Sequence, residues 1–150
     1  MKLKVLVGAG DRVMALTLPF AAIGVALNIL RPAWFHLGWG NPGLIAGIVL
    51  MAVGVPLWLV SVVQVLVHVP RRKLITRGPF ALMLHPIYTS VALLVLPGLG
   101  LALDTWLGVA VGAILYAASR IFSKSEEKIL AALFSTEYQA YRARVLLPWL

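Results

Sequence analysis

The sequence contains no cysteine, and charged residues are scarce along its 150 positions. Without cysteine the chain can form neither disulfide bonds nor metal sites with thiolate ligands, and its redox compartment stays undetermined. Charged residues make up 12% of the chain, whereas about 25% is typical of soluble domains, and 61% of the residues are hydrophobic. This balance predicts an integral membrane protein that folds as one domain, residues 1–150.

Positive charge predominates among the few charged residues, with 13 Lys and Arg against five Asp and Glu and a net charge of +8. In a soluble protein this excess would indicate nucleic acid binding, but in so apolar a chain it indicates attraction to anionic lipid headgroups. We therefore expect membrane lipids as partners and no nucleic acid. Residues 4–11 imitate a strand entering a dinucleotide-binding turn, but Val13 stands where that motif requires its third glycine, which disfavours a nucleotide site there.

Four apolar runs are long enough, at about 1.5 Å of rise per residue, to be membrane-spanning α-helices. Beyond them, Ser125 is a candidate N-cap, with Glu126 and Glu127 in the first turn and apolar residues at helical spacing afterwards. The pattern predicts an all-α, polytopic membrane helical bundle with four transmembrane helices and a C-terminal amphipathic cytoplasmic helix. The spans are expected at 13–30, 44–69, 87–103 and 106–122, and the C-terminal helix at 124–145.

Twelve of the thirteen Lys and Arg residues lie in the N-terminal segment, the loop after the second run or the C-terminal region. Only Arg31 lies on the other side. Because cytoplasmic loops of membrane proteins carry an excess of Lys and Arg, we expect both termini and the active site to face the cytoplasm. The basic cluster that contains Arg71 and Lys73 is interpreted as this topology signal.

The second apolar run carries a stripe of small residues, Gly43, Gly47 and Gly54. Spacings of four and seven residues place these glycines on one face of a helix, where they permit close helix packing. The stripe is compatible with a homodimer.

Two polar stretches interrupt the apolar pattern. The first runs from Gly78 to Tyr88, where His85 and Pro86 place a titratable imidazole at the edge of an apolar segment. The second begins at Glu126 and extends past Tyr138. We expect the two stretches to meet at one membrane surface and form the functional site.

These stretches read Gly-Pro-Phe-x4-His-Pro-x-Tyr and, after a helical hairpin, Glu-Glu-x2-Leu-x3-Phe-x2-Glu-Tyr-x2-Tyr. In this order they resemble the isoprenylcysteine carboxyl methyltransferase and phospholipid methyltransferase superfamily. The match covers roughly the C-terminal half of the chain. Leu84 departs from the pattern, because the family usually has arginine immediately before the His-Pro pair.

The resemblance implies an integral membrane methyltransferase that binds S-adenosylmethionine from the cytoplasmic side. Its pocket would lie between the ends of the last two spans and the C-terminal helix, with no metal. The acceptor would be a lipophilic small molecule, a lipid or a prenylated compound that enters from the bilayer. By the same resemblance, catalytic roles fall to Glu126 and Arg120, and cofactor binding to Gly78, His85, Pro86, Tyr88, Glu127 and Tyr138. Which residue acts as a base is left open.

Two other functions stay open. Membrane sterol and steroid reductases, which use NADPH, carry a similar His-Pro-x-Tyr, but they typically have Asn where this chain has Ile87. A non-catalytic membrane protein of the same fold is the second alternative, and Leu84 favours it. The ionisable groups retained in so hydrophobic a chain count against it, because such groups in membrane proteins usually have a task.

Overall fold

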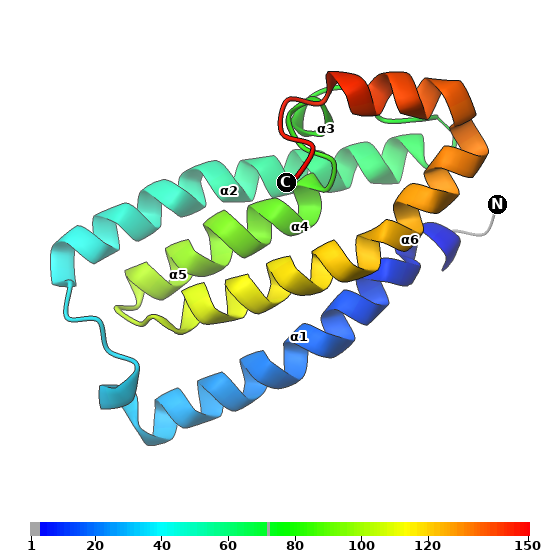
Figure 1. Ribbon diagram of the computed structural model, residues 1–150. Coiled ribbons are helices and arrows are strands. Elements are labelled where there is room, and N and C mark those ends of the chain that lie inside the picture. Colours follow the sequence, from blue (N-terminus) through cyan, green and yellow to red (C-terminus); the bar gives the residue numbers. More distant parts are fainter. Residues whose placement is uncertain (1–3, 72) are drawn as a thin grey trace.

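The computed structural model describes residues 4–71 and 73–150, and throughout this part of the chain the regular structure is helical, with no β-strand (Figure 1). The expectation of an all-α fold is therefore confirmed. The elements are α1 (Lys4–Leu30), η1 (Pro32–Trp34), α2 (Gly40–His68), α3 (Pro79–Leu82), α4 (Pro86–Ser90), η2 (Val91–Val95), α5 (Leu96–Ala102) and α6 (Leu107–Arg144). Residues 4–11 belong to α1, so no strand enters a nucleotide-binding turn there.

Within the described residues, three helices are long and apolar enough to cross a membrane, judged by length and composition. They are Gly10–Leu30, Gly40–His68 and Leu107–Arg144. The run expected at 87–103 forms a shorter apolar helix, Pro86–Ala102, whose middle turn, η2, is a π-helix. At about 1.5 Å per residue it is slightly shorter than the roughly 30 Å hydrocarbon core of a bilayer.

The boundary expected before the C-terminal helix, near residue 123, is wrong. Helix α6 continues without interruption from the apolar run 107–122 into the charged segment. Ser125 does not cap a helix, because it lies inside α6 and its hydroxyl group donates a 2.7 Å hydrogen bond to the carbonyl oxygen of Phe122. The backbone leaves helical geometry only at Ser135, with φ 40° and ψ −111°. There the chain turns, and the last part of α6 crosses the end of the bundle (Figure 1).

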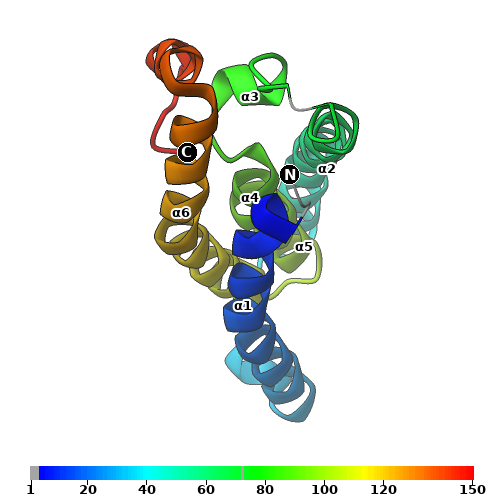
Figure 2. The same ribbon diagram turned by 90° about the vertical axis from the view of Figure 1, so that its right-hand side faces the viewer.

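The glycine stripe of α2 packs inside the molecule. Gly43, Gly47 and Gly54 are buried, and a Cβ atom at Gly47 would lie 2.6 Å from the backbone nitrogen of Ala102 in α5. Viewed from the end, α4 lies between α2 and α6, while α1 packs along α6 (Figure 2). The surface proposed for a homodimer from the sequence is thus already occupied by α5 of the same chain.

The two ends of the bundle differ in character. At one end, Nε2 of His36 lies 3.0 Å from Oδ2 of Asp104, beside the α5–α6 turn. At the other end lie α3, the beginning of α4, the last part of α6 and both ends of the described chain (Figure 1). Residues 145–150 run back alongside α3, where the backbone amide of Leu147 donates a 2.8 Å hydrogen bond to the carbonyl oxygen of Leu82. This second end carries both polar stretches identified in the sequence.

Candidate functional site

Two prolines determine the backbone of the first polar stretch. Pro79 begins α3 and Pro86 begins α4. Proline suits the first turn of a helix, because the backbone N–H that it lacks would have no partner within the helix there. His85 immediately precedes Pro86, and proline disfavours the helical conformation in the residue before it. His85 accordingly has φ −126° and ψ 60°. The break between α3 and α4 therefore holds the imidazole at the end of the bundle.

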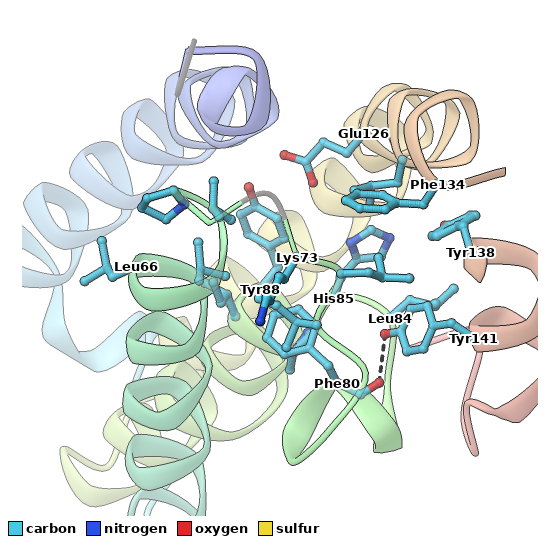
Figure 3. Close-up of a pocket in the computed structure, with 18 residues that line it drawn as sticks. Leu66, Lys73, Phe80, Leu84, His85, Tyr88, Glu126, Phe134, Tyr138 and Tyr141 are labelled. Atoms are coloured by element: carbon cyan, nitrogen blue, oxygen red, sulfur yellow. Dashed lines mark hydrogen bonds between the residues drawn. The ribbon is translucent and has the colours of Figure 1, made fainter. Parts of the chain in front are cut away.

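A partly open cavity of about 230 Å³ lies beside His85 (Figure 3). Its walls come from the C-terminal end of α2, the loop that follows, α3, the start of α4 and the charged part of α6. Most of the wall is apolar or aromatic, as with Leu66, Phe80 and Phe134. The titratable side chains in the wall are Lys73, His85, Tyr88, Glu126, Tyr138 and Tyr141. The cavity thus combines an apolar interior with a few polar groups, as small-molecule sites do.

His85 and Glu127 form the closest polar contact of the site. Nε2 of His85 lies 3.1 Å from Oε1 of Glu127, and their side chains are only 9% and 16% exposed. The other carboxylate oxygen of Glu127, Oε2, lies 3.4 Å from Nη1 of Arg142. The hydrogen bond from His85 holds the pKa of Glu127 below its usual range against the opposing effect of burial, and the charge of Arg142 adds to it. The carboxylate of Glu127 is therefore ionised and accepts the hydrogen bond from His85.

The neighbouring Glu126 is in a different environment. It lies beyond the apolar part of α6, and its side chain lines the cavity. Burial raises its pKa to about 7, and the negative charge of Glu127 adds to the shift. Figure 3 shows its carboxylate on the same side of the cavity as the Tyr88 hydroxyl, which in turn lies against Gly10 of α1. One glutamate is thus kept ionised, and the other titrates near neutral pH.

Leu84 and the tyrosines of the second stretch form a buried cluster. Leu84, Tyr138 and Tyr141 are 7%, 3% and 8% exposed and pack together with Val145. The Tyr141 hydroxyl donates a 2.8 Å hydrogen bond to the carbonyl oxygen of Phe80 (Figure 3). Burial raises the pKa of Tyr138, and the charge of Glu127 acts in the same direction. Leu84 is therefore part of an apolar cluster at the position where the resemblance expects an arginine.

The structure separates the residues expected at the site into two groups. His85, Pro86, Tyr88, Glu126 and Tyr138 line the cavity. The other three, Gly78, Arg120 and Glu127, do not belong to its wall. Glu127 is joined to the cavity wall by its hydrogen bond with His85.

Arg120 and Gly78 support the site from behind. A guanidinium nitrogen of Arg120, Nη1, is buried and has no hydrogen-bond partner in the described part of the protein. Its positive charge contributes to the lowered pKa of Glu127. Gly78 has φ +64°, and its Cα packs against the side-chain amide of Gln64 in α2. Gly78 thus connects the loop to α2.

Several lining residues were missed by sequence reasoning. Lys73 was read only as a topology signal, yet it lines the cavity. The apolar residues at the end of α2, such as Leu66 and Val69, carry no signal, because they look like any other part of an apolar run. Phe80 and Phe134 belong to the two motifs and could have been chosen on that ground.

The polar groups of the cavity wall offer partners for both a cation and an anion. Glu126 and the aromatic faces of Tyr88 and Phe134 can surround a cation, and Lys73 can meet an anion. Across residues 4–71 and 73–150, no group of three His, Asp or Glu side chains is arranged to hold a metal ion. Comparisons with protein-family models, curated proteins and solved structures found no match to this chain.

Proposed function

We propose that this protein is an integral membrane methyltransferase that uses S-adenosylmethionine to methylate a lipophilic acceptor. The observation that carries the proposal is the meeting of the two polar stretches around one cavity, with His85 3.1 Å from Glu127. Each stretch contributes residues in the order that resembles the membrane methyltransferase superfamily. Neither stretch by itself would specify a site.

The side chains of the cavity fit this cofactor chemically. Its sulfonium cation can be met by the Glu126 carboxylate and by aromatic faces, and its carboxylate by Lys73. Ligand pockets of about 300–1,000 Å³ are usual, so in a cavity of about 230 Å³ the cofactor would fill the space and extend through the open side. Bound there, the cofactor supplies an electrophilic methyl group. The task of the protein is then mainly to position the acceptor.

The topology that accompanies this proposal has four membrane spans, with Pro86–Ala102 as the short third span. The part of α6 beyond residue 122 would lie at the cytoplasmic surface, and its last turns would fold over the site. The straight part of α6, residues 107–134, is about 42 Å long at about 1.5 Å per residue, more than the roughly 30 Å hydrocarbon core, so its charged part must leave the membrane. The concentration of Arg and Lys at the site end supports a cytoplasmic orientation for this end.

The acceptor would reach the cavity from the bilayer. Leu66 of α2 lines the cavity and is also 64% exposed on the outer surface of the bundle. In a membrane that exposed face contacts lipid chains. This continuity of apolar surface supports a lipid or another lipophilic acceptor.

Binding measurements on the detergent-purified protein test the proposal. Calorimetric titrations with S-adenosylmethionine, S-adenosylhomocysteine and NADPH should give micromolar binding of the first two and none of the third. Glu126→Ala should abolish this binding, because the carboxylate faces the cavity. His36→Ala is the matched control, since His36 lies at the opposite end of the bundle.

Other outcomes would decide against the proposal. Binding of NADPH alone would assign the protein to the membrane reductases. If folded protein binds none of the three compounds, the non-catalytic function would replace the enzyme. Equal loss of binding in the control variant would show that the cofactor does not occupy the cavity beside His85.

A further inference from the structure

The contact between His85 and Glu127 determines which nitrogen of the imidazole carries hydrogen. An ionised carboxylate can only accept hydrogen bonds, so Nε2 of His85 must be the donor in their 3.1 Å contact. In a neutral imidazole the other nitrogen is then an acceptor with a free lone pair. The described residues provide one hydrogen bond to the imidazole of His85, and it engages Nε2, which leaves Nδ1 available to a ligand.

His85 lies between Glu127 and the cavity, so its second ring nitrogen is available to a molecule bound there. His85 lines the cavity, whereas Glu127 lies behind it and is held in turn by Arg142 at 3.4 Å. An imidazole between a buried carboxylate and a ligand cavity is oriented by the carboxylate, which also stabilises the imidazolium form. This arrangement suits proton removal from a molecule in the cavity.

We propose that His85 is the general base of this site, that Glu127 positions it, and that the acceptor is a lipophilic protic nucleophile. This inference rests on the methyl transfer proposed above. The acceptor heteroatom of a thiol, alcohol or amine forms a bond to the methyl carbon, and the carbon–sulfur bond of the sulfonium breaks with its electron pair left on sulfur. The proton of the heteroatom passes to Nδ1 of His85 and is later released to water.

A carboxylate acceptor fits the site less well. It is already deprotonated at neutral pH and needs no base. It would also enter a cavity whose wall contains Glu126, an acid with a pKa of about 7. Glu126 is itself a weaker candidate for the base, because no described residue makes a hydrogen bond that would orient its carboxylate.

The charged and titratable groups near His85 come from three parts of the fold. They are Tyr88 from α4, Lys73 from the loop after α2, and Arg120, Glu126, Glu127, Tyr138, Tyr141 and Arg142 from α6. Glu127 is the one described group within hydrogen-bond distance of the imidazole. The orientation of the ring therefore depends mainly on this carboxylate.

The hydrogen-bond state of His85 can be measured without cofactor or turnover. Nitrogen-15 spectra of histidine-labelled protein in detergent distinguish a protonated ring nitrogen from a free one. We expect His85 in the neutral state to carry hydrogen on Nε2. His68 is an internal control with the opposite assignment, because its Nδ1 lies 2.9 Å from the carbonyl oxygen of Gln64 and must donate to it. Hydrogen on Nδ1 of His85 would overturn the proposal.

Chemical probes then test the acceptor class in the same spectra. Decanol, decanethiol and decylamine should each shift the free Nδ1 resonance of His85, and decanoate should leave it unchanged. In Glu127→Gln the tautomer should become mixed and the three shifts should weaken. A shift with decanoate alone, or with none of the four compounds, would contradict a base that receives a proton from the acceptor.

Kinetics separate this inference from the proposed function. Glu127→Gln should lower kcat by about 10²–10⁴-fold, the range of general-base contributions, while the Kd for S-adenosylmethionine changes by less than about threefold. Loss of cofactor affinity with an unchanged kcat would make His85 a binding residue instead. Failure of the wild-type protein to bind the cofactor would reject the methyltransferase and leave the tautomer result standing by itself.

Discussion

The Tyr141 hydroxyl donates a 2.8 Å hydrogen bond to the backbone carbonyl oxygen of Phe80, 61 residues earlier in the chain. This bond joins the last part of α6 to α3 across one wall of the cavity. Helix α6 changes direction at Ser135, and this hydrogen bond holds its final turns against the first polar stretch. The cavity is thus closed by residues that are distant in sequence and meet only through tertiary contacts.

Removing this hydroxyl should destabilise the protein. In Tyr141→Phe the half-buried carbonyl oxygen of Phe80 loses its partner, so we expect the free energy of unfolding to fall by about 1–3 kcal/mol. Tyr116→Phe is a matched control, since it removes an exposed 2.9 Å hydrogen bond to Trp149. Unfolding of the detergent-solubilised proteins measures both effects. Equal losses in the two variants would contradict a special role for the Tyr141 contact.

A side chain at Gly78 is expected to destabilise the protein through its backbone conformation and, to a smaller extent, through Gln64, whose amide ends a flexible side chain. Its φ of +64° is in a region that other residues rarely adopt, and an added Cβ would lie 2.8 Å from the side-chain amide of Gln64. Gly78→Ala should therefore lower the free energy of unfolding by about 1–3 kcal/mol. Gly40→Ala, with φ +53° and open space around it, shows the backbone effect without the contact. A loss in Gly40→Ala as large as that in Gly78→Ala would argue against the Gln64 contact.

The packing of α2 on α5 predicts a second difference between glycines. In Gly47→Ala the new methyl group meets backbone atoms of Gly98 and Ala102, which cannot move without separating the helices. We expect a loss of about 1–3 kcal/mol in stability. In Gly24→Ala the nearest atoms belong to the flexible side chain of Leu107, so the loss should be smaller.

The oligomeric state of the same variants is also informative. If the α2 glycines pack only within the chain, Gly47→Ala changes stability and leaves the molecular mass of the protein in detergent unchanged. Light scattering during size-exclusion chromatography measures that mass. Conversion of a dimer into a monomer by Gly47→Ala would show that these glycines also face a second chain.

The two adjacent glutamates should give stability opposite dependences on pH. The pKa of Glu126 rises from 4.5 to about 7 on folding, so the stability it contributes is complete below its unfolded pKa and is lost as pH rises through 7. The pKa of Glu127 is lowered, so its contribution is present above the unfolded pKa and is lost as pH falls through the folded pKa. Unfolding measured between about pH 5 and about pH 8 tests the first sign.

Conservative variants isolate these contributions. Relative to wild type, Glu126→Gln should gain stability as pH rises from about 5 to about 8, because it lacks the group that loses its proton. Glu127→Gln should be less stable than wild type by the same amount across this pH range. The difference in the free energy of unfolding should shrink only under more acidic conditions. A loss in Glu126→Gln that increases with pH would contradict the raised pKa.

Much of the fold could be predicted because bilayer insertion depends on local composition. An apolar run must form a helix in lipid, where backbone groups find no water. The run at 44–69 accordingly matches α2 to within four residues at each end, whereas the run at 13–30 shares its last residue with α1, which begins nine residues earlier, at Lys4. The end of the fourth run was predicted less well. A serine and two glutamates look like a helix start, but nothing in residues 120–127 prevents a helix from continuing, and α6 passes through them.

The motif residues of the site were also visible in sequence, but their places around the cavity were not. Sequence placed Glu126 and Glu127 together as a pair, whereas helix rotation directs one into the cavity and the other behind His85. Lys73 and Leu66 enter the wall only because the loop and the end of α2 approach α4. No local pattern encodes that approach.

Composition and motif order alone therefore determined that the chain is helical, suited to a membrane, and polar at one end. Tertiary structure decided which glutamate meets His85, which one lines the cavity, and where α6 turns. The physical reason is that helix formation in an apolar run depends on neighbours three or four positions away. The protonation and orientation of a side chain depend on burial and on partners brought from distant parts of the chain.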